Sequence, residues 1–191
     1  MNKPAETTIS SSPTAEIAAR VCATGYEQLD REAIAMVKRL IADGVAVAIA
    51  GTIEEAPKLI AAHVRELGCT EQSSVWGFAF RTAPSQAAYA NAVSMHVLDF
   101  EPMSSPPTHA VSPTVAVALA LGESLKASGA EIVAACAKGF EMQGRVLLAS
   151  SHDRGALKFH TPGVVGVMGS TVAAAHLLKL NNPGIFEAKH G

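Results

Sequence analysis

The chain has 191 residues and a mass of 19.7 kDa; 49% of the residues are hydrophobic and 17% are charged. These values fit one globular domain and exclude a disordered chain, a collagen and a disulfide-rich scaffold. The formal net charge of −2 gives no basic excess for binding nucleic acid. Alanine, the strongest helix former, is the commonest residue, so we predict an all-α protein built as a compact multi-helix bundle.

The three cysteines form no C-x-x-C pair, and their odd number favours reduced thiols in a cytoplasmic protein. We expect Cys22, Cys69 and Cys136 to be small, buried core residues. Residues 1–13 form a polar tail without the apolar segment of a signal peptide. The most apolar stretch, residues 162–180, contains polar residues and glycines, which favours a buried core helix over a membrane span.

Helical signals begin soon after the polar tail. Residues 15–26 have apolar side chains at helical spacing, and Asp30 is a suitable N-cap for the next helix, which runs through Ile41. Residues 45–51 are apolar all round, which predicts a helical segment that is buried on every face. We expect Gly51 to follow this segment as its C′ residue.

The middle of the chain alternates between helical and irregular patterns. Residues 54–67 form an amphipathic pattern that ends at Gly68, and residues 73–80 break the helical period, as a short extended segment would. A helix resumes over residues 85–98. Residues 99–113 contain four prolines and cannot be helical, and so long a loop inside a compact domain is usually functional or disordered.

Capping signals place the remaining helices. Ser112 followed by Pro113 predicts an N-cap and the first position of a helix that reaches residue 127. Ser128 and Glu131 form an S-x-x-E capping box for a helix that reaches residue 149. After a second polar loop, the last helix starts at Thr161.

Three glycines recur every three residues in the last helix. No strand precedes Gly163, Gly166 and Gly169 in a βαβ unit, so they do not indicate a dinucleotide site. We interpret them as a stripe that allows another helix to approach closely.

Four of the seven histidines flank the two loops: His96, His109, His152 and His160. Free imidazole has a pKa near 6.5 and exchanges protons at neutral pH. Asp99, three residues after His96, can hold a histidine tautomer or act as a base. The helix N-termini that follow the loops offer unpaired N–H groups to a negatively charged substrate.

Each of these residues has a structural alternative. A histidine near a helix end is commonly a cap, His152 lies in a polar loop as surface residues do, and His96 on a largely apolar face suits a structural hydrogen bond. A zinc site formed by His96, Asp99, His109 and His160 has no supporting H-E-x-x-H or Cys/His spacing, so we expect no metal.

Five segments, in order between about residues 30 and 180, resemble the MmgE/PrpD family. They are REAIAMVKRLIADGVAVAIAG, ANAVSMHVLDFE, THAVSPTVAVALALGE, KGFEMQGRV and KFHTPGVVGVMGSTVAAAHLLKL. The resemblance implies the family's helical domain over residues 14–182, without the α/β lid domain of full-length members, and an irregular end over residues 183–191. It also implies cofactor-free chemistry on a di- or tricarboxylate substrate, and a homodimer.

The resemblance assigns site residues as well. Asp99, His109 and His160 correspond to the family's catalytic positions, and we expect His96, Thr108 and Thr161 to bind the substrate. The family's D-F-D-D-T segment begins at Asp99. Its second and third acids fall on Glu101 and Pro102, and its threonine falls on Met103.

The predicted function is that of a family lyase resembling 2-methylcitrate dehydratase, in which Asp99 or His160 removes a proton and His109 protonates the leaving hydroxyl. A family decarboxylase or epimerase is the alternative within the family. Family members are more than twice this length and their catalytic lysines lie in the additional part, so we expect a fragment. Two alternatives are therefore an inactive helical domain that only folds or dimerises, and a helical binding module.

Overall fold

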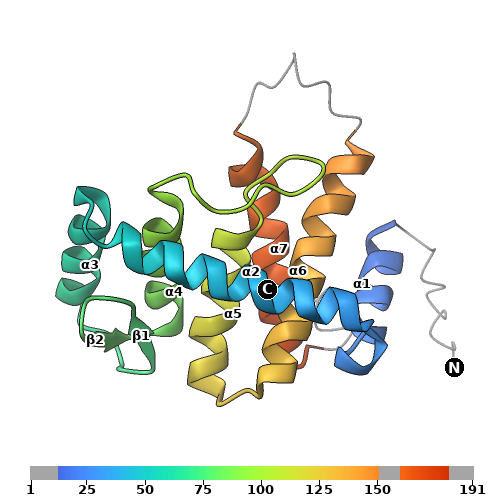
Figure 1. The fold of residues 1–191 in the computed structure, drawn as a ribbon. Coiled ribbons are helices and arrows are strands. Elements are labelled where there is room, and N and C mark those ends of the chain that lie inside the picture. The colour runs from blue at the N-terminus through green and yellow to red at the C-terminus, as the bar shows by residue number, and fades with distance from the viewer. Residues whose placement is uncertain (1–12, 151–159, 181–191) are drawn as a thin grey trace, which may run out of the picture.

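A computed structural model describes residues 13–150 and 160–180, and this part is almost entirely helical (Figure 1). The helices are α1 Pro13–Ala23, α2 Arg31–Gly51, α3 Glu55–Leu67, α4 Pro84–His96, α5 Val111–Leu125, α6 Gly129–Ala149 and α7 Thr161–Leu177, with a 3-10 turn, η1, at Tyr26–Gln28 and two short strands, β1 Ser73–Val75 and β2 Phe80–Thr82. The all-α prediction is confirmed. Within these described ranges, no helix has both the length and the apolar character that a bilayer crossing requires.

The core forms around α5, which packs against α2, α4, α6 and α7. Met95, Val115 and Cys136 are fully buried in the main apolar cluster, and a second cluster containing Val64 and Val75 joins α3 and β1 to α4. In Figure 1, α2 crosses in front of α4, α5 and α6. The proline-rich loop between α4 and α5 lies beside the upper end of α7 in this view.

Glycines set the closest helix contacts. A Cβ on Gly166 would lie 3.1 Å from Pro113 Cγ, and one on Gly169 would collide with the buried side chain of Gln143. These two contacts confirm close helix packing for Gly166 and Gly169, whereas Gly163 is exposed and a Cβ there would meet only His160 Nδ1, at 3.7 Å. Gly51 is the last residue of α2 rather than its C′ residue, and a Cβ there would collide with the backbone oxygen of Ser94.

Two predictions of complete burial were wrong. Residues 31–51 form a single helix with one buried stripe that includes Gly44, Ala48 and Gly51, whereas Ile49 is 48% exposed. In α7, Val165 is buried but Val167 is 65% exposed. The physical reason is the same in both cases: each helix packs on the core with one face, and apolar composition does not say how many faces are covered.

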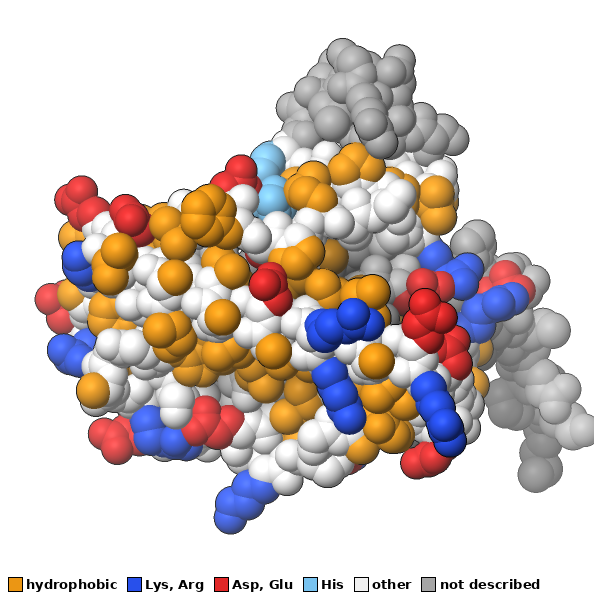
Figure 2. Space-filling model, viewed as in Figure 1, with side chains coloured by type: hydrophobic (Ala, Val, Ile, Leu, Met, Phe, Trp, Pro, Cys, Tyr) orange, Lys and Arg blue, Asp and Glu red, His pale blue; other side chains and the backbone are white. Residues whose placement is uncertain are grey.

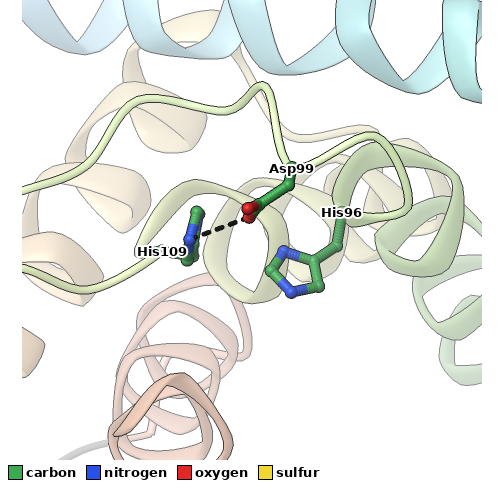
Figure 3. A group of neighbouring side chains, drawn as sticks. All are labelled: His96, Asp99 and His109. Carbon is green, nitrogen blue, oxygen red and sulfur yellow. Dashed lines mark ion pairs between the residues drawn. The ribbon is translucent and has the colours of Figure 1, made fainter.

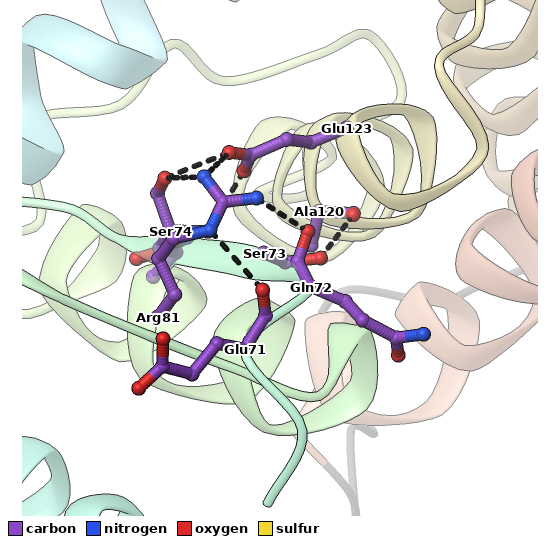
Figure 4. A network of polar contacts seen from close by, with 8 residues as sticks. Glu71, Gln72, Ser73, Ser74, Arg81, Ala120 and Glu123 are labelled. Carbon is purple, nitrogen blue, oxygen red and sulfur yellow. Dashed lines mark hydrogen bonds and ion pairs between the residues drawn. The ribbon is translucent and has the colours of Figure 1, made fainter.

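A polar network holds the hairpin of β1 and β2 against α5 (Figure 4). Ser74 donates to Glu123 from its backbone N–H at 2.7 Å and from its hydroxyl at 2.8 Å, and Arg81 pairs with the same carboxylate. Ser73 adds a hydroxyl bond to the carbonyl of Ala120. The hairpin is the extended segment expected after α3.

Two of the three cysteines are not in the core. All three are free thiols, but Cys22 on α1 and Cys69 after α3 are exposed, so the expected burial is correct only for Cys136. Burial raises the pKa of Cys136 to about 12, which keeps this thiol protonated and inert. Cys22 is exposed because α1 packs mainly on α7 and is not part of the central core.

Capping residues in the sequence predicted the starts of α2 and α6 correctly. Asp30 accepts a hydrogen bond from the Ala33 N–H at 2.7 Å, and Ser128 and Glu131 form both bonds of the capping box. The first helix is shorter than expected, because the chain leaves α1 at Ala23 and turns through η1.

Candidate functional site

The proline-rich loop between α4 and α5 folds back on itself. Asp99 follows α4 in the left-handed conformation, with φ of 55°, and its N–H bonds to the carbonyl of His96. Further along, Met103 and His109 form an isolated antiparallel bridge, and the Ser104 N–H donates to Thr108 O at 3.1 Å. This pairing returns His109 to the end of α4.

His109 therefore lies against Asp99 and His96 (Figure 3). His109 Nε2 is 3.1 Å from Asp99 Oδ1, and the rings of His96 and His109 are 4.9 Å apart in an edge-to-face arrangement. His160, at the start of α7, places its ring 6.4 Å from that of His96. The structure thus brings together Asp99 and three of the four histidines that we expected at the two loops, His96, His109 and His160.

A fifth member, Glu101, was not selected as a site residue. Its side chain is fully buried beneath the histidines. The carboxylate accepts the Ser112 N–H at 2.6 Å, contacts His96 Nδ1 at 2.7 Å and lies 3.7 Å from His109 Nδ1. The available signal was its position as the second acid of the segment that begins with Asp99.

Glu101 also explains why α5 starts earlier than expected. The helix begins at Val111 after Ala110, so Ser112 is not the N-cap and Pro113 is the third helical residue. Ala110 has no capping side chain, and the Glu101 carboxylate takes the Ser112 N–H instead. The Glu101 carboxylate thus occupies the place of an N-cap side chain at the start of α5.

The hydrogen bonds orient the imidazoles. An ionised carboxylate only accepts hydrogen bonds, so His96 carries a proton on Nδ1 and directs Nε2 away from Glu101. His109 Nδ1 is buried and has no hydrogen-bond partner among the described residues, while Nε2 faces Asp99. His96 Nε2 therefore remains available for proton exchange, whereas His109 can exchange a proton only through Nε2, on the side of Asp99.

Exposure increases from the floor of the cluster to its rim. The side chain of Glu101 is 0% exposed, that of His109 14%, that of His96 39% and that of Asp99 77%. Figure 2 shows histidine side chains reaching the surface at the top of the molecule. A solute can therefore approach the Asp99–His109 pair, which can take up and return a proton.

The remaining predicted residues occupy different positions. Thr108 is 1% exposed, and its hydroxyl has no partner in the described part of the chain, so it lies beneath the loop surface. Thr161 is half-buried at the first position of α7, directly after His160. His152 lies outside the described residues.

The same cluster has the donors of a metal site. His96, Asp99 and His109 can each offer one ligand atom, and these atoms all lie within 4.8 Å of one another. Two imidazoles and a carboxylate suit zinc or another transition metal. Acid–base chemistry uses the same atoms without an ion, so a test of function has to separate the two.

Comparisons with known proteins give one family match and two relatives. A family model, the MmgE/PrpD N-terminal domain, matches residues 15–189. Cis-aconitate decarboxylase from Mus musculus is 35% identical over 150 residues, which cover 75% of this chain and 31% of that protein. The Homo sapiens cis-aconitate decarboxylase is 34% identical over 157 residues, covering 79% and 33%. The chain thus spans about a third of the length of these curated relatives.

Proposed function

Because this chain belongs to the MmgE/PrpD family, we propose that it supplies the acid–base half of a lyase site for a di- or tricarboxylate. The observation that carries the proposal is the 3.1 Å approach of His109 Nε2 to Asp99 at an open surface, over a buried carboxylate. A pair of this kind moves a proton without a cofactor.

The proposed proton path runs through Nε2 of His109, because its Nδ1 atom is buried. Asp99 holds His109 from the Nε2 side, and Glu101 lies on the Nδ1 side. His109 in its protonated form is the acid, and Asp99 or His160 is the base that removes a proton next to a substrate carboxylate. His160 is exposed at the N-terminus of α7, where it can reach a substrate that lies over His96.

Binding of the substrate's carboxylates draws on the same end of the molecule. The α7 N-terminus, which begins at Thr161, carries the positive end of the helix dipole and, apart from Pro162, N–H groups that have no acceptor within the helix. His96 and His109 add donors. In this proposal the helix N-terminus and the two histidines bind one carboxylate of the substrate, while the acid–base pair transfers a proton at the neighbouring carbon.

Two reactions fit this arrangement. In a decarboxylation the C–C bond to a carboxylate breaks, carbon dioxide leaves, and His109 protonates the carbon that keeps the electron pair. In a dehydration the base removes a proton from carbon and His109 protonates the departing hydroxyl, which leaves as water. The two cis-aconitate decarboxylases favour the first. The resemblance to 2-methylcitrate dehydratase favours the second, and a homodimer is part of the same proposal.

The experiment follows binding and turnover separately. The purified 191-residue chain is mixed with cis-aconitate or 2-methylcitrate, and NMR records both the products and the imidazole resonances of His109. We expect saturable shifts of the His109 ring with the true substrate. Any turnover should fall by about 10²- to 10⁴-fold in His109→Gln, whereas His63→Gln, a change at an exposed histidine of α3, should leave it unchanged.

Two results would redirect the proposal. Turnover that survives in His109→Gln would remove this residue from the mechanism. Neither turnover nor His109 shifts with either substrate would favour the inactive folding unit. Treatment with the chelator EDTA distinguishes acid–base catalysis from metal-dependent catalysis. Acid–base turnover persists after EDTA treatment, and metal-dependent turnover does not.

A further inference from the structure

A second polar group lies at the other end of α7, well away from the cluster. Lys138 of α6 is only 7% exposed, and its Nζ is 2.9 Å from Nδ1 of His176. His176 is sixteen residues after His160 on the same helix, which corresponds to roughly 24 Å along its axis. The candidate acid–base site therefore makes no use of this pair.

The hydrogen bond fixes the state of both side chains. An ammonium group only donates, so the Nδ1 atom of His176 accepts and the ring carries its proton on Nε2. That Nε2 atom is buried and has no partner among the described residues. Desolvation and then the nearby Lys138 lower the pKa of His176 to about 4, so the ring is neutral at pH 7. Lys138 thus has a neutral partner, not a counter-ion.

The lysine faces a pocket of about 330 Å³ between α1, α6 and α7. Its lining residues are Val21, Cys22, Lys138, Ala175, His176, Lys179 and Leu180, and none of them is acidic. Buried charges are normally paired, because an unpaired ion loses its hydration without compensation. Lys138 lies at the wall of a pocket that has no acidic residue, so its positive charge lacks the anion with which a buried lysine is normally paired.

The nearby acceptors are already engaged. Lys179 at the pocket rim pairs with Glu131, which also accepts from Ser128, so this one acid is matched to one of the two lysines. The last carbonyls of α7, those of Ala174, Ala175 and His176, accept the N–H groups of Leu178, Leu180 and Lys179. One positive charge, on Lys138, remains without an anion in the part of the chain that the structure describes.

We propose that this pocket binds a small oxyanion, a phosphate or a carboxylate, with Lys138 as its buried cationic group and Lys179 at its rim. The donors of the site are the ammonium groups, because the Cys22 thiol already faces the Leu180 carbonyl at 3.9 Å, and none of the lining residues is acidic. The volume admits a small organic anion as well as inorganic phosphate. Burial lowers the pKa of Lys138, and a bound anion would offset that penalty, so binding and the charged state of Lys138 stabilise each other.

The test titrates the 191-residue chain with sodium phosphate and, separately, with sodium succinate at constant ionic strength. NMR shifts of the His176 ring and of the α1 and α7 backbone report binding. We expect saturable shifts with at least one anion, weakened about tenfold or more in Lys138→Met and unchanged in Lys38→Met, a matched change at an exposed lysine of α2. The anion that saturates tells a phosphate site from a carboxylate site.

Lys138→Met should fold, because replacing a buried charge that has no acid partner with an apolar side chain removes a desolvation penalty. If circular dichroism shows otherwise, Lys179→Ala at the rim serves instead and should weaken binding a few-fold. Non-saturating shifts with both anions, or equal affinity in wild type and in the folded lysine variant, would overturn the proposal. The readout at His176 is independent of the lyase activity proposed for the other end of α7.

Discussion

Replacing the buried acid beneath the histidines is the most informative perturbation. In Glu101→Gln the side chain keeps its shape, but only one of its two terminal atoms is still an oxygen. The carboxylate uses one oxygen for the Ser112 N–H and the other for His96. The amide can therefore accept only one of these bonds, and its NH₂ group faces the other donor.

The expected cost follows from the two bonds. A hydrogen bond to a charged group contributes about 1 kcal/mol more than a neutral one, so weakening both should lower the free energy of unfolding by roughly 2 kcal/mol. Glu101→Ala leaves two donors without a partner and should cost about 4 kcal/mol. The matched control is Glu141→Gln on α6, where the exposed pair with Arg145 should contribute less than about 0.5 kcal/mol.

Urea unfolding followed by circular dichroism measures these differences, and ¹⁵N NMR of the imidazoles gives a second readout. If the amide oxygen keeps the Ser112 N–H, the NH₂ group faces His96, and the ring must move its proton from Nδ1 to Nε2 to accept. Stability within about 0.5 kcal/mol of wild type in both Glu101 variants, together with an unchanged His96 tautomer, would refute this account of the buried acid.

Three further predictions concern the scaffold. Gly51→Ala should destabilise the protein by more than about 2 kcal/mol in urea unfolding, because its Cβ meets the Ser94 backbone, whereas Gly144→Ala, with open space at its Cβ, should be neutral or stabilising by up to about 1 kcal/mol; equal effects would contradict the packing argument. Because the unfolded chain protonates His176 first, the free energy of unfolding should fall as pH drops from about 6.5 to about 4, by roughly 1 to 2 kcal/mol after allowance for its partial exposure, and His176→Gln should flatten this pH dependence. Ser128→Ala should cost about 1 kcal/mol through loss of the capping box, measured by the same unfolding assay, and an unchanged midpoint would show that the box does not stabilise α6.

The parts of the fold that the sequence predicted are those fixed by neighbouring residues. Asp30 and Ser128 cap helices because their side chains reach N–H groups three residues away. Thr161 starts the last helix, with proline at the next position. Alternating helix and loop signals likewise gave the all-α class, since both are short-range properties of the chain.

What the sequence did not predict depends on distant contacts. Glu101 becomes buried because the loop turns through the left-handed Asp99 and meets the start of α5, eleven residues later. The Glu101 carboxylate accepts the Ser112 N–H at the start of α5, so it takes the place of the N-cap side chain that we predicted to be Ser112. The exposed side of α2 is another example, because an apolar residue such as Ile49 does not reveal whether another element covers it.

The most direct test of the central proposal follows hydrogen exchange at carbon. The 191-residue chain is incubated in D₂O with cis-aconitate or 2-methylcitrate, and NMR detects deuterium at the carbon next to a carboxylate. The account predicts incorporation that is retained in His63→Gln and lost in both Asp99→Asn and His109→Gln. Incorporation that persists in these two variants would contradict a proton-transfer role for the cluster.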